Sequence, residues 1–428
     1  MPASSVRDAP GFVWLWVGTG VSALGSFVGS LALSFAVVET LHASPAAVAA
    51  LGVVQLAAGG IAAPLAGVLV DRLRRRRLMV VADVGRTAAI AVLPIAHHAG
   101  HLSIWLVGGV GALTGIGNVL FNAAYQSHLP RFVGRERIVG ANATIAMTVS
   151  LAEIAGFASA GWLVHLLGAP NALLVDAVSF VVSAACILAI PGAEPARPPR
   201  PARRRRTDGT PRFAEVTAGA RHIAREPVLR VLVGTAAVYD IAVAMIGVTY
   251  LLYLANDVGF DEGVLGTIFA IGGITSLIGA RVAHRAERAG RMGRVFAFAG
   301  LVRTVGTAAM PAAGSTGASG VGLLVANQVV TDPAWMLQEI AEASIRQARS
   351  PDEIAGRISA AHQLTGTCGR LLGTVAAGVI AQVWSPRVAL WTASSLCLAA
   401  SLLLIASPIR RLTRAAAIAE SRAAPAQM

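Results

Sequence analysis

A dense run of charge closes the segment Gly67-Val-Leu-Val-Asp71-Arg72-Leu-Arg74-Arg75-Arg76-Arg77. It closes an apolar segment at 45–70 and leads into another at 78–98. Crossing a bilayer as a helix takes about 20 apolar residues, and both segments are long enough. A dense run of charge between two such segments predicts two membrane-spanning helices joined by a loop in water.

The composition of the whole chain agrees with a membrane protein. Of its 428 residues 55% are hydrophobic and only 13% are charged, with a mean hydropathy of +0.66. Soluble proteins carry about 25% charged residues, so a soluble domain is excluded, as are disordered chains and disulfide-stapled secreted scaffolds. The three cysteines, Cys186, Cys368 and Cys397, lie inside apolar runs and are predicted to be free, buried thiols.

Twelve segments are long and apolar enough to span a membrane. The sequence therefore predicts an all-α polytopic membrane protein with twelve transmembrane helices. The spans are expected at roughly 12–38, 45–70, 78–98, 103–128, 139–166, 171–191, 228–254, 262–284, 293–313, 318–344, 354–383 and 387–407.

The arginines predict the orientation of these spans. All 35 basic residues are Arg, and 31 of them fall in the segments that would share one side of the membrane, against Arg387 alone on the other. Positive charge marks the cytoplasmic side, so we expect both termini in the cytoplasm of a cell whose inner or plasma membrane holds the chain. The net charge of +13 is thereby explained by topology, without nucleic-acid binding.

The chain repeats itself with a nearly constant shift in residue number. Gly18-Thr19 recurs as Gly234-Thr235, and Arg86-Thr87 recurs as Arg303-Thr304. We therefore expect two pseudo-symmetric six-helix halves, at 1–191 and 228–407, with a cytoplasmic tail at 408–428. Parallel repeats of this kind are typical of secondary transporters, which bind substrate near the middle of the membrane.

A Pro/Arg-rich linker at 192–227 separates the halves. Its first part, 192–211, cannot pack a core, and the run Arg203–Arg206 is expected to lie near anionic lipid headgroups. A specific lipid or regulatory site is the alternative for that run. The remainder has helical spacing and is expected to lie along the inner membrane surface.

The loop at 67–77 resembles the signature loop of the major facilitator superfamily, in which a Gly and an Asp precede basic residues. More narrowly, the chain resembles the drug:proton antiporter branch that includes macrolide and siderophore exporters. Three segments carry this second resemblance, which extends over residues 11–407: Asp83-Val-Gly-Arg86, Asp176-Ala-Val-Ser-Phe180 and Gly219-Ala-Arg-His-Ile-Ala-Arg-Glu-Pro-Val-Leu-Arg230.

The resemblance implies that the signature loop is a conformational latch for the outward-facing state. Its members here would be Gly67, Asp71, Arg72 and Arg75. Gly67 would permit close approach of a helix, and Asp71 at a helix end can bond N–H groups or Arg side chains. Alternatively, the arginines only fix the orientation of the spans in the membrane, but this does not explain the presence of Asp71.

Ionisable residues inside the spans are candidates for proton coupling, because inserting one costs about 2.5–3.5 kcal/mol. Glu153 lies in the middle of 139–166, and Arg370 is its repeat equivalent in 354–383. Asp240 lies in the middle of 228–254, which the resemblance implies is a cavity-lining span. Each acid is expected either to carry a proton or to form a static buried ion pair or hydrogen bond.

Polar side chains within the spans predict a substrate cavity. Three are spaced four apart on one helix face, one lies beside Asp240, and one lies in the span at 318–344. The candidates are Asn118, Asn122, Gln126, Tyr239 and Asp332. Glu339 and Glu342 belong to the same last span, but they lie near its cytoplasmic end, where water can reach them.

Two arginines at equivalent positions differ in their neighbours. Asp83 and Arg86 are three residues apart, share a helix face and are expected to form a structural pair. Arg303 has Gly300 where the repeat would place that Asp, and it is expected to reach another helix.

These observations favour a secondary transporter that exports hydrophobic or amphipathic small molecules by proton antiport and alternating access. A dedicated natural-product or siderophore exporter is one alternative, and a non-transporting receptor or lipid-handling protein is another. No catalytic constellation and no phosphate-binding loop occurs, so we expect no enzyme, cofactor or metal, and no use of ATP. Sodium remains an alternative to the proton, and the chain is expected to act as a monomer.

The orientation predicts the outcome of cysteine labelling. A Cys placed at Gly100 should react with a membrane-impermeant reagent added outside intact cells, and one at Gly209 should react only after permeabilisation. The reverse labelling pattern would overturn the orientation.

The latch predicts that Asp71→Asn lowers transport strongly while the amount of protein in the membrane stays close to normal. The reason is that a contact used in switching is lost while no core is opened. Transport assays paired with immunoblots of membranes measure both quantities. Normal transport by this variant would contradict the latch and leave the loop with the single role of setting the membrane orientation.

Overall fold

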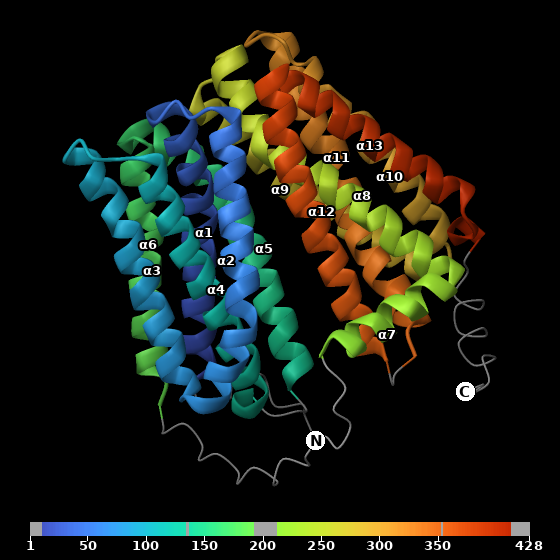
Figure 1. The fold of residues 1–428 in the computed structure, drawn as a ribbon, viewed down its shortest axis with the longest axis horizontal. Coiled ribbons are helices and arrows are strands. Elements are labelled where there is room, and N and C mark those ends of the chain that lie inside the picture. The colour runs from blue at the N-terminus through green and yellow to red at the C-terminus, as the bar shows by residue number, and fades with distance from the viewer. Residues whose placement is uncertain (1–10, 134–136, 192–211, 352–353, 412–428) are drawn as a thin grey trace. The chain divides into compact units, whose positions relative to one another are not determined.

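The structure is a computed structural model that describes residues 11–133, 137–191, 212–351 and 354–411. These residues are helical and include no strand. The helices are α1 Phe12–Phe35, α2 Pro45–Arg72, α3 Arg75–His98, α4 Ile104–Val133, α5 Ile138–Leu167, α6 Ala169–Ala189, α7 Arg212–Arg225, α8 Pro227–Leu252, α9 Glu262–Arg288, α10 Met292–Ala312, α11 Ala318–Arg349, α12 Ala355–Val383 and α13 Pro386–Ala406 (Figure 1).

Several helix starts are written into the sequence. α2 begins with Ser44, whose side chain accepts a hydrogen bond from the Ala47 N–H, followed by Pro45. Ser385 and Pro386 start α13 in the same way. A side-chain N-cap satisfies a free N–H group, and Pro fits the first helical turn because its fixed φ is already helical.

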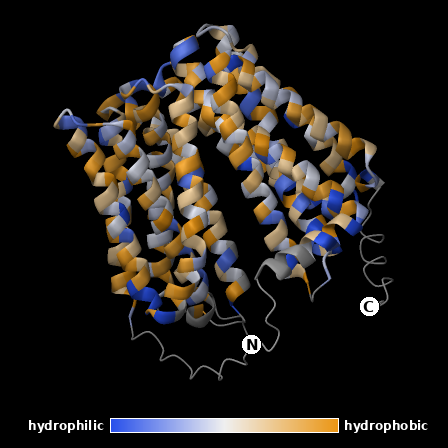
Figure 2. Cartoon of the chain, in the orientation of Figure 1, coloured by the Kyte–Doolittle hydropathy of each residue, from blue (hydrophilic) through white to orange (hydrophobic). Residues whose placement is uncertain are grey.

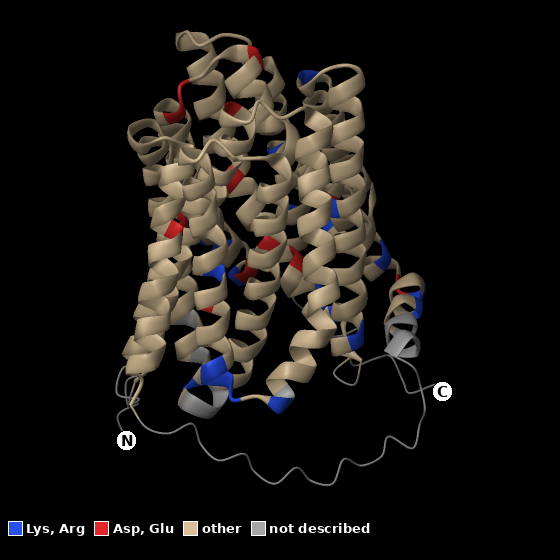
Figure 3. Ribbon diagram, turned by 60° about the vertical axis from the view of Figure 1, so that its left-hand side comes forward, with Lys and Arg blue, Asp and Glu red and all other residues tan. Residues whose placement is uncertain are grey.

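The predicted all-α membrane fold is confirmed. Among the described helices, eleven are long and apolar enough to cross a membrane. α11, at the span predicted for 318–344, is not among them, because polar residues such as Asn327, Gln328 and Asp332 lower its hydropathy. Apolar residues dominate the ribbons in Figure 2, and charged residues are sparse along the helices in Figure 3.

The chain divides into two compact units. One comprises Met1–Ala196 with Leu254–Gly273, and the other comprises Arg197–Tyr253 with Ile274–Met428. The start of α9 therefore packs with the first unit. Within that unit, Gly161 of α5 lies directly against the backbone of Gly266 of α9, which leaves no room for a side chain at either position.

The first unit is held together by α1, which packs against both α5 and α6. Its apolar core includes Phe12 and Leu15 of α1 and Met79 of α3, all of them buried. Asp176 of α6 accepts a hydrogen bond from Ser26 of α1 at 3.2 Å, so the acid of the Asp-Ala-Val-Ser-Phe segment joins two helices.

The second unit repeats four of the helix pairs of the first. The pairs α1–α5, α1–α6, α3–α6 and α3–α4 have counterparts in α8–α12, α8–α13, α10–α13 and α10–α11. The helices that pack in equivalent pairs are also the ones related by the nearly constant shift in residue number. The boundaries 1–191 and 228–407 for the two halves remain a prediction.

α7 lies in the second part of the 192–227 segment, for which the sequence predicts a helix. It packs on α12, where Gly219 contacts the Arg357 carbonyl region so closely that no side chain would fit. Predictions that concern residues 1–10, the linker at 192–211 and the tail from 412 lie outside the described residues.

One expectation about the cysteines is wrong. All three are free, and Cys186 and Cys397 are buried, but Cys368 is exposed on α12. An apolar run does not distinguish the face of a helix that meets its neighbours from the face turned away from them.

Candidate functional site

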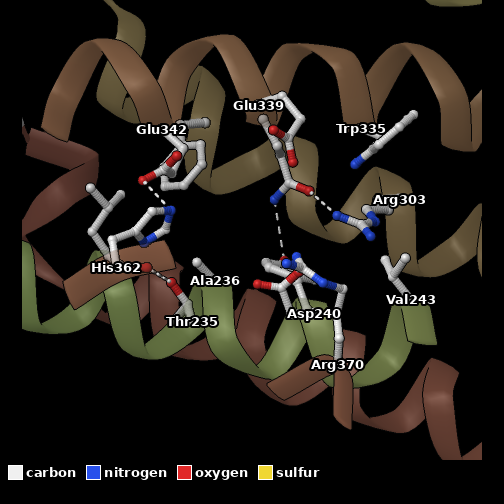
Figure 4. Close-up of a pocket in the computed structure, with 14 residues that line it drawn as sticks. Thr235, Ala236, Asp240, Val243, Arg303, Trp335, Glu339, Glu342, His362 and Arg370 are labelled. Atoms are coloured by element: carbon white, nitrogen blue, oxygen red, sulfur yellow. Dashed lines mark hydrogen bonds and ion pairs between the residues drawn. The ribbon is translucent and has the colours of Figure 1, made fainter. Parts of the chain in front are cut away.

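A polar pocket of about 320 Å³ lies within the second unit, between α8, α10, α11 and α12. The pocket is lined by Leu232, Thr235, Ala236, Tyr239, Asp240, Val243, Phe296, Arg303, Trp335, Gln338, Glu339, Glu342, His362 and Arg370 (Figure 4).

One wall of the pocket carries an ion pair. Arg370 Nη1 of α12 donates to Asp240 Oδ1 of α8 at 3.0 Å, and both side chains are partly exposed, at 41% and 25%. Glycines of α12 bring these helices together. A Cβ at Gly366 would lie 2.6 Å from the Asp240 carboxylate, and one at Gly373 would collide with the Ile241 carbonyl oxygen. Only glycine permits so close an approach.

α11 supplies the opposite wall (Figure 4). Glu342 forms an ion pair with Arg346 one turn further along, at 3.0 Å, and lies 3.7 Å from His362 Nε2 of α12. His362 Nδ1 is buried and has no hydrogen-bond partner among the described residues. Protonation of His362 would strengthen its attraction to Glu342, so this part of the wall can respond to a proton.

Arg303 enters the pocket from α10. It is 6% exposed, donates from Nη1 to Gln338 Oε1 at 3.2 Å, and holds its guanidinium 4.6 Å from the centre of the Tyr239 ring. The Tyr239 hydroxyl in turn bonds Ser401 at 2.9 Å and accepts from Gln338 at 3.2 Å. The guanidinium is thus held by neutral groups and an aromatic face.

The equivalent arginine of the first unit has different surroundings. Arg86 forms a buried ion pair with Asp83 and donates to Asn118 Oδ1 at 2.6 Å. Its guanidinium also stacks over the rings of Phe121 and Phe180. The predicted structural pair of Asp83 and Arg86 is therefore present.

Comparison with known proteins identifies the family. The sequence of residues 15–338 matches the family model of the Major Facilitator Superfamily. The chain belongs to the major facilitator superfamily. This facilitator is 27% identical over 385 residues to y4rN of Sinorhizobium fredii, an uncharacterized MFS-type transporter, with 88% of this chain and 90% of the relative covered. It is 23% identical to YfiS of Bacillus subtilis, another uncharacterized MFS-type transporter, with 88% of each chain covered.

Solved transporters share the fold of this facilitator. The nucleoside transporter NupG aligns with a TM-score of 0.72 at 13% identity, covering 92% of this chain and 98% of NupG. A bacterial homologue of the iron transporter ferroportin aligns with a TM-score of 0.70 at 16% identity, covering 92% and 98%. At this level of identity the likeness establishes the fold and leaves the substrate open.

The structure brings together three of the residues expected to matter in this facilitator: Tyr239, Asp240 and Arg370 line one pocket. Asp332, on the same helix as Glu339, is not among the residues that line it. Asn118 holds Arg86, while Asn122 and Gln126 are exposed on α4. The three residues of the α4 stripe belong to the first unit, whereas this pocket is lined by residues of the second.

Glu153 is half-buried in α5 of the first unit. No hydrogen bond or ion pair joins its carboxylate to another side chain in the described part of the chain. Arg370, its repeat equivalent, has Asp240 as its partner. The acid that balances Arg370 is therefore Asp240.

The latch residues of this facilitator lie around the start of α3. Arg75 is buried and donates from Nε to Ser127 of α4 at 2.6 Å, whereas Arg72 is exposed. A Cβ at Gly67 would meet no described atom within 4 Å, so no helix approaches closely there in this conformation. The side chain of Asp71, at the end of α2, lies outside the described part.

Four residues of α11 were not selected from the sequence as cavity residues. The sequence feature that could have identified them is their spacing, which places them on one face of α11: Trp335, Gln338, Glu339 and Glu342. The position of the two acids near the end of the span favoured contact with water instead. His362 lacks a local signal, because its partner Glu342 is on another helix.

The two equivalent arginines predict different costs of removal. Arg86→Gln leaves Asp83 buried without its cation, which costs about 3–5 kcal/mol. Arg303→Gln leaves no unpaired carboxylate within contact and should cost about 1.5–3 kcal/mol for its hydrogen bonds. Thermal unfolding of the purified variants in detergent measures the difference. Equal losses would contradict the distinction.

Proposed function

We propose that this facilitator exports hydrophobic or amphipathic small molecules by proton antiport and alternating access. The pocket between α8, α10, α11 and α12 would bind the substrate and take part in coupling. The chain would lie in the plasma membrane as a monomer with both termini in the cytoplasm, as the distribution of arginines favours.

The observation that carries this proposal is the ion pair of Asp240 and Arg370 on the wall of a cavity. Charges inside a membrane protein are expensive and are retained where they bind ions or substrates. Both side chains remain partly accessible, so a proton or a charged substrate group can reach them. An ion pair used only for structure has no need of that access.

The pair suggests a mechanism of exchange. A proton bound to Asp240 neutralises the carboxylate and removes its attraction for Arg370. Loss of the proton restores the pair at 3.0 Å, and a substrate that contacts either group competes for the same charge. His362 and Glu342, in the same pocket, supply a second pair that responds to protons. Glu153 is a further candidate carrier.

Other functions make different predictions for the same pocket. A dedicated exporter of one natural product or siderophore would use it for a single compound. Sodium could replace the proton, since carboxylates bind either ion. A receptor or lipid-handling protein on this scaffold would bind ligand without moving ions against it.

Inverted membrane vesicles test the proposal. A transported compound should collapse a proton gradient established beforehand, and vesicles without the protein should keep theirs. Collapse that depends on added sodium would identify the other ion. No collapse for any compound that binds the protein would contradict antiport and favour the receptor.

Single substitutions should separate coupling from binding. Asp240→Asn or Glu153→Gln should abolish gradient-driven export while binding or downhill exchange continues, because a neutral amide keeps the shape of the acid. Glu287→Gln, an exposed acid on α9, is the matched control and should export normally. Export and exchange are measured in the same vesicles.

A double substitution distinguishes a carrier from a counter-ion. If Asp240 only balances Arg370, then Asp240→Asn with Arg370→Gln should regain active export. We expect this double variant to regain stability but not export. Glu153→Gln with Arg370→Gln should likewise fail to recover. If export by Asp240→Asn and by Glu153→Gln depends on pH as it does in the unsubstituted protein, neither residue couples transport to protons.

A further inference from the structure

Two side chains of the pocket carry opposite charges that no ion pair satisfies. No carboxylate oxygen of a described residue lies within 4.0 Å of the Arg303 guanidinium, although that side chain is only 6% exposed. Glu339 of α11 likewise forms no ion pair within 4.0 Å with a described residue. Both side chains line the same cavity.

The internal repeat places a glycine in this half where the first half has an acid. In the first unit Asp83 neutralises Arg86. The shift that takes Arg86 to Arg303 also takes Asp83 to Gly300. A Cβ at Gly300 would lie 2.5 Å from the Tyr239 hydroxyl, so the tyrosine occupies the space that an acidic side chain would need. The second unit has the buried cation, but neutral groups stand where the first unit has the local counter-ion.

The other acids of the pocket are already paired. Asp240 is paired with Arg370 and Glu342 with Arg346. Glu339 is therefore the acid left over, and it comes from the helix next to Arg303, as α10 packs against α11. The two charges line the same space of about 320 Å³, and no ion pair within 4.0 Å joins them.

We propose that the pocket binds small zwitterions, with the anionic group on the Arg303 guanidinium and the cationic group near Glu339. The flat fork of Arg suits a carboxylate or another planar anion, which it can hold through two hydrogen bonds. Val243, Phe296 and Trp335 add apolar surface to the same pocket. This inference rests on the proposed transport function and narrows its amphipathic substrates to those with both charges.

Uncharged binding partners would leave both ends unmatched. A neutral ligand would cover Arg303 and Glu339 without replacing the water that solvates them, which is unfavourable. A ligand with one charge would satisfy one end only. A zwitterion satisfies both and leaves the net charge of the pocket unchanged.

A series of matched probes tests the inference. Phenyl, naphthyl and indole scaffolds of equal length are prepared with an amine, a carboxylate, both groups or a neutral hydroxyl. Binding to the full-length protein in detergent is measured by thermal stabilisation and by calorimetry. The compounds with both charges should stabilise most. If they do not, or if none of them binds, the inference is overturned.

Variants assign the two ends. Arg303→Gln should lower the affinity for zwitterions and anions by about tenfold or more, the loss expected for a charge-assisted hydrogen bond, and spare the cations. Glu339→Gln should lower the affinity for zwitterions and cations and leave the affinity for anions unchanged. Arg294→Gln, an exposed arginine on the same helix as Arg303, is the control and should change neither. Arg303→Lys, which keeps the charge, should retain part of the affinity.

The outcomes separate this inference from the transport mechanism. Zwitterion binding that depends on Arg303 and Glu339, without movement of protons in vesicles, would keep the pocket and contradict antiport. Proton-coupled export of neutral compounds, unaffected by either substitution, would keep antiport and contradict the inference. Affinities of Arg303→Gln and Glu339→Gln equal to those of the unsubstituted protein would overturn it whatever the transport result.

Discussion

The cost of placing a charge inside a membrane is the constraint on which this structure depends. Each buried ionisable group must find an opposite charge, a set of hydrogen bonds or a water-accessible space. Asp83 and Arg86 meet that need within one helix, and Asp240 and Arg370 meet it across two. Arg303 meets it with an amide, an aromatic face and a pocket.

The difference between the two arginines links the repeat to chemistry. Both halves pack equivalent helix pairs, so the scaffold has been kept while the residues inside it have diverged. In the first unit the arginine is closed into its surroundings by Asp83, Asn118 and two aromatic rings. In the second, Gly300 stands at the position of the acid, and the cation lines a cavity instead.

Much of the fold could be predicted from the sequence because the membrane imposes simple rules. Apolar runs of sufficient length specify spans, and α1, α6 and α12 lie close to the predicted ranges. The repeat shift indicated the equivalence of Arg86 and Arg303, and Gly300 indicated that the second arginine needs a partner elsewhere. These signals are local or periodic, so one sequence is enough to read them.

The site was less accessible to this kind of reasoning because its contacts are distant in the chain. Asp240 and Arg370 are 130 residues apart, and their pairing depends on how α8 and α12 pack around glycines. The sequence could not say which face of α12 meets its neighbours, which is why the exposure of Cys368 was missed. The acids of α11 were ambiguous for the same reason, since water and a polar pocket favour the same residues.

If substrate binds in the charged pocket of the second unit, an experimental structure of the protein with a transported compound bound will show it. We expect density for the compound between α8, α10, α11 and α12, in contact with Arg303 and Glu339. A transported compound bound only outside that pocket, with both side chains unchanged, would contradict it.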